Sequence, residues 1–253
     1  MPNVRNRDAE ASDESVMAPD AGRRVTAEAV GTALLLAAVV GSGIMANRLS
    51  AGNEAIALLA NTIATGAALV ALILTFGPIS GAHFDPAVTI ADASQGGLAW
   101  REVPGYLCAQ IGGAVLGVWA AHLMFGEPVF MLSLHQRSGS AQMFSEFVAT
   151  FGLLAVIWGC SRRRTDIVPF AVAAYITSAY WFTASTSFAN PAVTFARGLT
   201  DTFAGIRPLD VPGFVVAQFA GAAVSTLLFR WLVPALPQTA EHVVMPRSET
   251  SRS

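Results

Sequence analysis

Ser80-Gly-Ala-His-Phe-Asp-Pro-Ala-Val-Thr-Ile-Ala91 is echoed later in the chain by Thr186-Ser-Phe-Ala-Asn-Pro-Ala-Val-Thr-Phe-Ala196. Each segment follows a long apolar run, but each is too short and too polar at its start to cross a bilayer. Asp85 and Asn190 are of the types that cap a helix start, and the proline after each suits the first helical position. The sequence therefore predicts two half-helices. Such a pair at matching positions of two halves indicates a permeation site near the membrane midplane.

The composition is that of a membrane protein with several spans. Apolar residues make up 53% of the chain and charged residues 13%, and the mean hydropathy is +0.53. Cys108 and Cys160 both fall in apolar segments, so we expect no disulfide framework, metal site or cofactor. Residues 1–24 are polar and lack the apolar core of a signal peptide, which predicts a disordered tail, and 235–253 forms a second one.

Six segments have the roughly 20 mostly apolar residues that a membrane-spanning helix needs. They are 25–46, 54–76, 103–125, 141–160, 167–187 and 211–232. One half-helix follows the second span and the other follows the fifth. We therefore expect one all-α domain over 25–234, with a first repeat at 25–125 and a second at 140–234.

The two repeats resemble each other directly. Ala27-Glu-Ala-Val-Gly-Thr-Ala-Leu-Leu matches Ser145-Glu-Phe-Val-Ala-Thr-Phe-Gly-Leu, which aligns Glu28 with Glu146, and Val103-Pro-Gly-Tyr-Leu-Cys-Ala-Gln matches Val211-Pro-Gly-Phe-Val-Val-Ala-Gln. Because each repeat has an odd number of spans, the second repeat must enter the membrane in the opposite orientation. The half-helices then approach from opposite sides and meet at their N-terminal ends.

Short basic segments predict the orientation in the cell (inner) membrane. Arg23-Arg24 precedes the first span and Arg162-Arg163-Arg164 lies between the fourth and fifth spans. Both fall on the same side, and the positive-inside rule makes that side cytoplasmic. Both termini are then expected in the cytoplasm.

These motifs resemble the major intrinsic protein family, the aquaporins and aquaglyceroporins, over roughly residues 25 to 233. The resemblance implies a right-handed bundle of six transmembrane helices plus two re-entrant half-helices. It also implies one pore per subunit, a homotetramer in the lipid bilayer, and passive flow of water or small neutral solutes, with no enzymatic activity and no nucleic acid partner. The pore motifs that it implies are Asp85, Pro86 and Ala87, and Asn190, Pro191 and Ala192.

Backbone carbonyls before each half-helix are expected to replace the hydration of a solute along one wall of the pore, because unpaired backbone is tolerated at that depth only where it lines a cavity. The residues concerned are Gly81, Ala82 and His83, and Ser187, Phe188 and Ala189. The N-terminal ends of the half-helices each carry about half a positive charge, which opposes cations and protons.

The chain departs from the family pattern at two positions. Asp85 replaces the usual Asn of the first motif, and we expect its carboxyl to be at least partly neutral. Val193 follows the second Asn-Pro-Ala, where many members have an Arg, and Arg197 lies one helical turn further on. By spacing, Thr65, Tyr180, Ser187 and Val193 form the selectivity filter, with Ser178 as the alternative to Tyr180. Such a filter would be wide and rather apolar, with no fixed charge.

The run from Asn190 to Ile206 resembles a bacterial subgroup of aquaglyceroporins associated with arsenic resistance. This resemblance implies permeation of arsenous acid and methylated arsenicals alongside glycerol-like polyols and water. The alternatives are a water-selective or glycerol channel with no arsenical role, and a proton-coupled transporter that uses Asp85. An enzyme using His83 with Asp85 lacks a paired nucleophile or metal set.

Three features have a structural and a functional interpretation. Glu28 and Glu146 either accept hydrogen bonds from the re-entrant backbone, as buried carboxylates require, or relay protons. His83 is either a packed, hydrogen-bonded residue or a pH-sensitive gate. Tyr180-Trp181 is either part of the filter or part of an aromatic belt at the membrane interface.

Overall fold

The computed structural model describes residues 19–161 and 164–233, and all regular secondary structure in these ranges is helical. The α-helices are α1 (Ala21–Leu49), α2 (Glu54–Ser80), α3 (Pro86–Gln95), α4 (Val103–Phe125), α5 (Ser140–Ser161), α6 (Val168–Phe182), α7 (Pro191–Arg197) and α8 (Val211–Leu232). Two single 3-10 turns, η1 (Thr165–Ile167) and η2 (Pro208–Asp210), precede α6 and α8.

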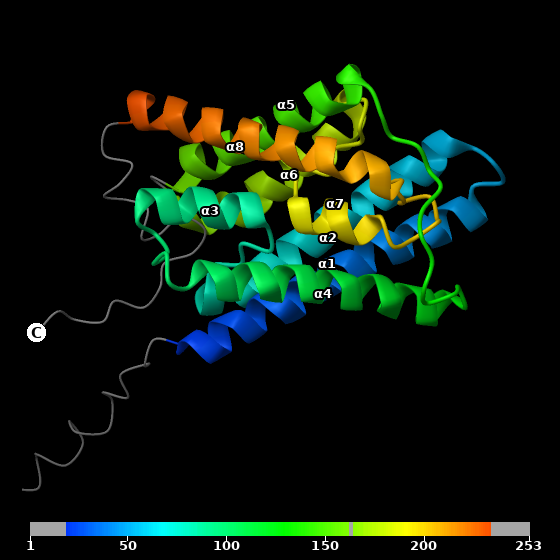
Figure 1. Ribbon diagram of the computed structural model, residues 1–253, viewed down its shortest axis with the longest axis horizontal. Helices are drawn as coiled ribbons and strands as arrows, with labels where there is room; N and C mark the ends of the chain where they lie inside the picture. Colours follow the sequence, from blue (N-terminus) through cyan, green and yellow to red (C-terminus); the bar gives the residue numbers. More distant parts are fainter. Residues whose placement is uncertain (1–18, 162–163, 234–253) are drawn as a thin grey trace, which may run out of the picture.

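The long helices lie side by side along the long axis of the molecule, and α3 and α7 lie between α4 and α8 (Figure 1). We call the end where α1 begins and α8 ends the terminal face. The opposite end, where the segment 126–139 connects α4 to α5, is the loop face. Within each repeat the first and last long helices pack together, α1 on α4 and α5 on α8, while α2 and α6 join the repeats. This is the predicted all-α inverted repeat.

Among the described residues, five helices are long and apolar enough to cross a membrane: α1, α2, α4, α5 and α8. The sixth predicted span, 167–187, is wrong at its C-terminal end, because α6 stops at Phe182 and has only 15 residues. Thr183 already has an extended backbone, with φ −107° and ψ 139°. The residues after it connect α6 to α7. The backbone groups of this connection form hydrogen bonds with other parts of the protein and not within a helix.

The predicted half-helices are confirmed. α3 begins at Pro86 and α7 at Pro191, each in the first turn after a capping side chain. They contact each other and run to opposite ends of the molecule, α3 toward the terminal face and α7 toward the loop face (Figure 1). Their N-terminal ends therefore meet in the middle of the bundle.

The ends of the chain only partly correspond to the predicted tails. α1 begins at Ala21, four residues before the predicted start, because Asp20 caps it by accepting a 2.8 Å hydrogen bond from the backbone N–H of Arg23. Residues 1–18 of the tail predicted at 1–24, the tail at 235–253, and Arg162 with Arg163 lie outside the described residues.

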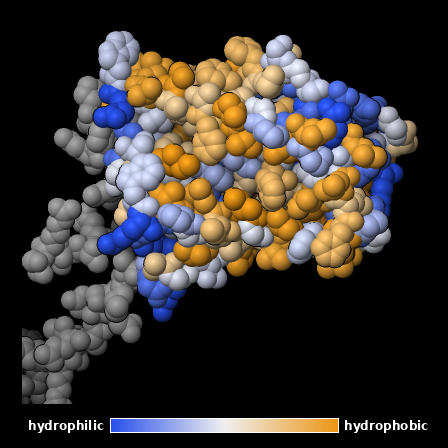
Figure 2. Space-filling model, in the orientation of Figure 1, coloured by the Kyte–Doolittle hydropathy of each residue, from blue (hydrophilic) through white to orange (hydrophobic). Residues whose placement is uncertain are grey.

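The surface has the distribution that a bilayer requires. Apolar residues cover the middle of the molecule, and hydrophilic residues gather toward both ends (Figure 2). Large apolar side chains that are more than half exposed occur on several spans, among them Ile63, Leu116, Leu123 and Leu227. Such a surface is stable against lipid and not against water.

Small residues allow the paired helices to approach closely. A Cβ atom built on Gly117 of α4 would lie 2.2 Å from the carbonyl oxygen of Ala33 on α1, and one built on Gly221 of α8 would lie 2.3 Å from that of Phe147 on α5. Gly113, which aligns with Gly221 in the repeat, makes the equivalent contact, since a Cβ atom built on it would lie 2.2 Å from the carbonyl oxygen of Ala29. Glycine at a helix contact of this kind lets backbones touch in membranes.

We expect Gly117→Ala to lower the midpoint of thermal unfolding in detergent, because the added methyl group would push α1 and α4 apart at a cost of about 1–3 kcal/mol. Gly112→Ala is the matched control on the same helix, since a Cβ there meets no atom within 4 Å. Equal midpoints for the two variants would contradict the close-packing interpretation.

Candidate functional site

The meeting point of the half-helices is held by capping side chains. Oδ1 of Asp85 accepts hydrogen bonds from the backbone N–H groups of Ala87 at 2.7 Å and Val88 at 3.4 Å. Oδ1 of Asn190 accepts from those of Ala192 at 2.9 Å and Val193 at 3.1 Å. Each cap satisfies N–H groups that a helix start leaves unpaired.

The second polar atom of each cap differs between the repeats. Nδ2 of Asn190 donates a 2.8 Å hydrogen bond to the carbonyl oxygen of Phe84, the residue before Asp85. Oδ2 of Asp85 is buried and has no hydrogen-bond partner in the described parts of the chain. A carboxylate has no donor with which to copy the amide of Asn190, whereas a protonated carboxyl has one.

The backbone before each half-helix includes residues with positive φ, a conformation that is rare for residues with a side chain. Positive φ angles occur at Ala82 (47°) and Phe84 (50°), and at the equivalent Ser187 (50°) and Ala189 (52°). Left-handed backbone costs about 1–2 kcal/mol per residue for L-amino acids, so other contacts must stabilise it. The two segments share this pattern although their sequences differ, which indicates a common purpose for their carbonyl groups.

Two buried carboxylates, Glu28 of α1 and Glu146 of α5, stabilise these segments, and we call them the anchoring carboxylates. Glu28 accepts hydrogen bonds from the backbone N–H groups of His83 at 3.0 Å and Phe84 at 2.7 Å. Glu146 accepts from those of Phe188 and Ala189, both at 2.9 Å. This is the acceptor arrangement predicted from their symmetric positions. These hydrogen bonds hold the backbone N–H groups of the two segments toward α1 and α5.

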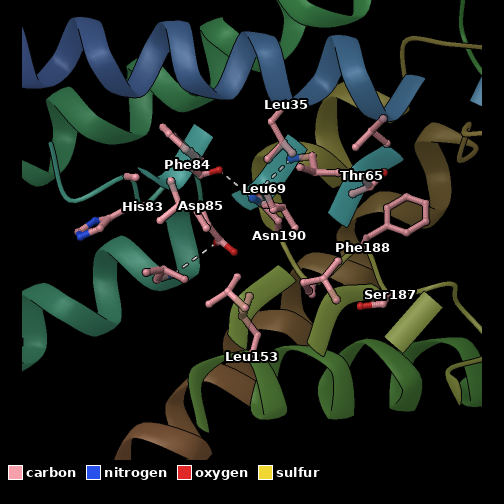
Figure 3. A pocket seen from close by; sticks show the side chains of 18 of the residues that line it. Leu35, Thr65, Leu69, His83, Phe84, Asp85, Leu153, Ser187, Phe188 and Asn190 are labelled. Atoms are coloured by element: carbon pink, nitrogen blue, oxygen red, sulfur yellow. Dashed lines mark hydrogen bonds between the residues drawn. The ribbon is translucent and has the colours of Figure 1, made fainter. Parts of the chain in front are cut away.

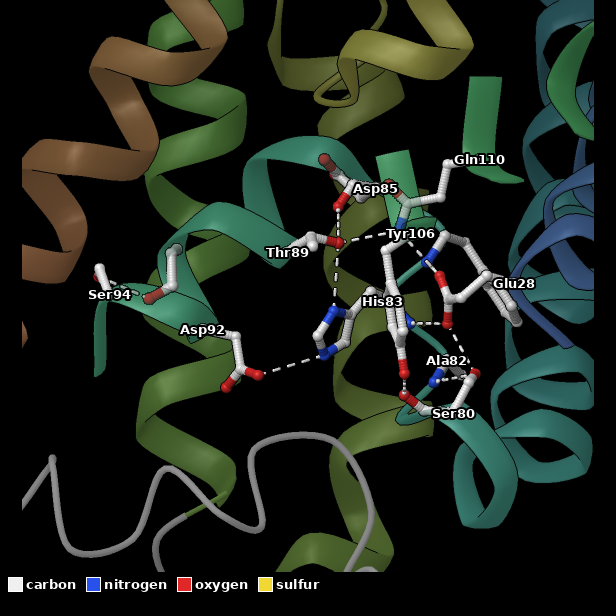
Figure 4. A network of polar contacts seen from close by, with 12 residues as sticks. Glu28, Ser80, Ala82, His83, Asp85, Thr89, Asp92, Ser94, Tyr106 and Gln110 are labelled. Carbon is white, nitrogen blue, oxygen red and sulfur yellow. Dashed lines mark hydrogen bonds and ion pairs between the residues drawn. The ribbon is translucent and has the colours of Figure 1, made fainter. Parts of the chain in front are cut away.

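Each anchoring carboxylate is tied to the half-helix of its own repeat through a glutamine. Gln110 donates 2.8 Å hydrogen bonds to both Glu28 and the hydroxyl of Thr89 on α3, a network drawn in Figure 4. Gln218 donates to Glu146 at 2.5 Å and to Thr194 on α7 at 2.7 Å. These glutamines occupy matching positions in the two repeats, but no pattern in the sequence indicates their role.

His83 is packed and bonded. Its Nδ1 lies 3.2 Å from the hydroxyl of Thr89, and its Nε2 lies 3.5 Å from a carboxylate oxygen of Asp92 (Figure 4). The ring also packs at a tilt against Tyr106, with 5.5 Å between centroids. These contacts favour the structural interpretation of this histidine.

A cavity of about 80 Å³ extends from this junction between the two repeats (Figure 3). A water needs roughly 10–15 Å³ of such space, so the cavity has room for several waters or one small solute. Asp85 and Asn190 lie on its wall, as do the segments 82–84 and 187–189. Most of the remaining wall is apolar: Leu35, Val39, Leu69, Ile73, Val88, Leu153, Ile157, Val172, Ile176 and Val193.

The residues predicted for the filter all line this cavity, namely Thr65, Tyr180, Ser187 and Val193. The phenol of Tyr180 donates to the hydroxyl of Thr65 at 3.3 Å, which brings α2 and α6 together at this level. The alternative, Ser178, is on the exposed side of α6 and donates to the carbonyl of Tyr175. Trp181 is also largely exposed on the outside of that helix.

One predicted position differs from the observed one. Gly81 is not part of the cavity wall, because it ends α2 as a left-handed cap with φ 89°. The wall of the first repeat is instead Ala82, His83 and Phe84, one residue further along. Phe84 could have been predicted from its alignment with Ala189. Arg197 lies behind the wall, with its guanidinium 3.4 Å from the ring centroid of Phe188 and its Nε bonded to the carbonyl of Ala204.

Comparison with known proteins agrees with this geometry. Residues 15–177 match the model of the major intrinsic protein family. The chain is 56% identical over 219 residues to aquaglyceroporin AqpS of Rhizobium meliloti, covering 86% of this chain and 94% of that protein. It is 33% identical to aquaporin NIP1-1 of Zea mays, covering 81% of this chain and 74% of the relative.

The fold matches a solved structure of the aquaglyceroporin from Plasmodium falciparum with a TM-score of 0.65 and 21% identity, covering 87% of this chain and 100% of the other. Proteins of this family are channels and not enzymes. Head-to-head half-helices, a cavity between two inverted repeats and the matches over most of the chain lead to one conclusion. This chain belongs to the major intrinsic protein family and is a passive channel for small solutes.

Proposed function

We propose that the chain conducts arsenous acid, methylated arsenicals, glycerol-like polyols and water through a filter formed by Thr65, Tyr180, Ser187 and Val193. The observation that carries this proposal is the buried Val193 on the cavity wall, where many relatives place an Arg. A valine leaves more space than an Arg and adds no charge. Arsenous acid at neutral pH is an uncharged polyol mimic, which suits such a filter. The resemblance to AqpS, named an aquaglyceroporin, supports the same class of solute.

We also propose the membrane, the oligomeric state and the orientation of the channel. We place the protein in the cell membrane as a homotetramer, with the terminal face in the cytoplasm. Arg23 and Arg24 lie in the first turn of α1 at that face, and Arg164 lies between α5 and η1, in agreement with the positive-inside rule.

Swelling of proteoliposomes in gradients of glycerol, arsenous acid and water tests the proposal. Light scattering should show faster entry of all three than in protein-free vesicles, with no change when a proton gradient is imposed. Entry of water alone would support the water-selective alternative, and entry of glycerol without arsenous acid would remove the arsenical role. Uptake that follows the proton gradient would support a coupled transporter.

We further propose that Asp85 is at least partly neutral, because its Oδ2 is buried without a partner in the described residues. Asp85→Asn should then keep glycerol flux within about twofold of the parent, since a protonated carboxyl and an amide both offer a donor there. Proton flux, followed with a pH-sensitive dye inside the vesicles, should be low in both. A large proton flux in the parent that disappears in Asp85→Asn would contradict this.

A further inference from the structure

A positive charge that the half-helix motifs do not provide lies behind one side chain of the cavity wall. Arg137 lies in the segment 126–139 at the loop face, outside every helix. Its guanidinium carbon is 5.2 Å from the ring centroid of Phe188, which lines the cavity. Arg197, from α7, contacts the same ring at 3.4 Å. Two guanidinium groups from different elements therefore pack on one pore-lining side chain.

Arg137 is held in place by groups of the second repeat. Its backbone N–H donates a 2.9 Å hydrogen bond to Asp210, and its Nε donates at 2.8 Å to the carbonyl of Gly205. The remaining guanidinium nitrogens reach the carbonyls of Ser185 at 3.4 Å and Phe203 at 3.5 Å. Ser185 lies in the segment that leads into α7. The side chain is thereby fixed against the re-entrant segment and is not free in solvent.

Neither guanidinium is neutralised by a carboxylate at contact distance in the described ranges 19–161 and 164–233. The partners of the Arg137 guanidinium group are neutral carbonyls and an aromatic face, which bind a cation without cancelling its charge. Burial lowers the pKa of Arg137 below its usual value, yet arginine stays protonated at neutral pH. A charge in a narrow mouth with apolar walls acts strongly on ions, because the field is poorly screened there.

We propose that Arg137 is a specificity-determining residue of this channel. Together with Arg197 it surrounds Phe188 with positive charge at the loop-face end of the pore, where it excludes cations and leaves neutral solutes free to pass. The charge that Val193 does not supply thus comes from a loop, without the bulk of an Arg inside the filter. This inference rests on the proposed permeation of neutral solutes.

The test compares entry of methylammonium, a small cation, with entry of glycerol into proteoliposomes at a pH where almost all the amine is charged. We expect Arg137→Ala and Arg137→Gln to raise the ratio of methylammonium to glycerol flux at least about tenfold, because one unit of repulsive charge is lost. Arg137→Lys should keep the ratio of the parent. Glutamine retains N–H donors for the carbonyls, so a purely structural role would let Arg137→Gln behave as the parent.

Arg48→Ala is the matched control. Arg48 ends α1 at the same face and binds the carbonyl of Phe125 at 2.9 Å and Glu127 at 2.8 Å, and its guanidinium packs on the ring of Phe125, which does not line the cavity. Its loss should leave the flux ratio unchanged. The inference alone is overturned if Arg137→Ala and Arg137→Gln match the Arg48→Ala ratio while glycerol still enters. Absence of glycerol entry through the parent would overturn the proposed function and this inference together.

Discussion

Val193→Arg is expected to reduce glycerol and arsenous acid flux by at least about tenfold while water still passes, because filters discriminate strongly by size. Val193 is buried on the cavity wall beside Thr65, Tyr180 and Ser187, in a space of about 80 Å³. A longer side chain there fills the passage and brings a guanidinium close to those of Arg137 and Arg197. Stopped-flow light scattering of proteoliposomes measures the three fluxes on one preparation.

Two further substitutions separate bulk from charge at this position. Val193→Thr has nearly the same volume and should leave the glycerol flux close to that of the parent. Val193→Leu adds bulk without charge and should give an intermediate flux. If Val193→Arg conducts glycerol as fast as Val193→Thr, position 193 does not form the constriction and the proposed filter is wrong.

Glu146→Ala is expected to prevent recovery of folded channel. The substitution leaves the backbone N–H groups of Phe188 and Ala189 and the amide of Gln218 without their acceptor inside the protein. Each buried donor without a partner costs about 1–3 kcal/mol, so the total is about 3 kcal/mol or more. The lost hydrogen bonds also belong to a segment whose left-handed backbone conformation requires stabilising contacts. Size-exclusion chromatography in detergent, followed by thermal unfolding, measures the loss.

Glu54→Ala is the control for Glu146→Ala, since Glu54 is exposed at the start of α2. Glu28→Ala should resemble Glu146→Ala, because Glu28 accepts from Ser80 and Gln110 as well as from two backbone N–H groups. A Glu146→Ala protein that elutes and unfolds like Glu54→Ala would show that the anchoring carboxylates are not needed for the fold.

Much of the fold could be predicted from the sequence because its signals are local. Capping residues followed by Pro86 and Pro191 indicate helix starts whatever surrounds them, and apolar length indicates spans. The C-terminal end of α6 could not be predicted from local signals of this kind. Residues 183–187 are compatible with a continuing helix, and they leave it because Glu146, distant in sequence, binds the N–H groups that follow.

The candidate site was predictable where the internal repeat applies and not elsewhere. Aligning the repeats identifies Glu28 with Glu146, and the same alignment would have placed Phe84 on the wall opposite Ala189. Arg137 has no counterpart in that alignment and lies in a segment without periodic pattern. Its place beside Phe188 depends on carbonyls of Ser185, Phe203 and Gly205, which only the tertiary structure brings together.

The anchoring carboxylates also bear on how the chain is made. Glu28 and Gln110, which hold the first re-entrant segment, both precede residue 126. Glu146 and Gln218, which hold the second, both follow it. Between the two caps, the link from Asn190 to Phe84 crosses from one repeat to the other. The N-terminal half can thus satisfy its own buried carboxylate while the ribosome is still translating the C-terminal half, so that each half enters the bilayer with its costliest charge already solvated by peptide groups.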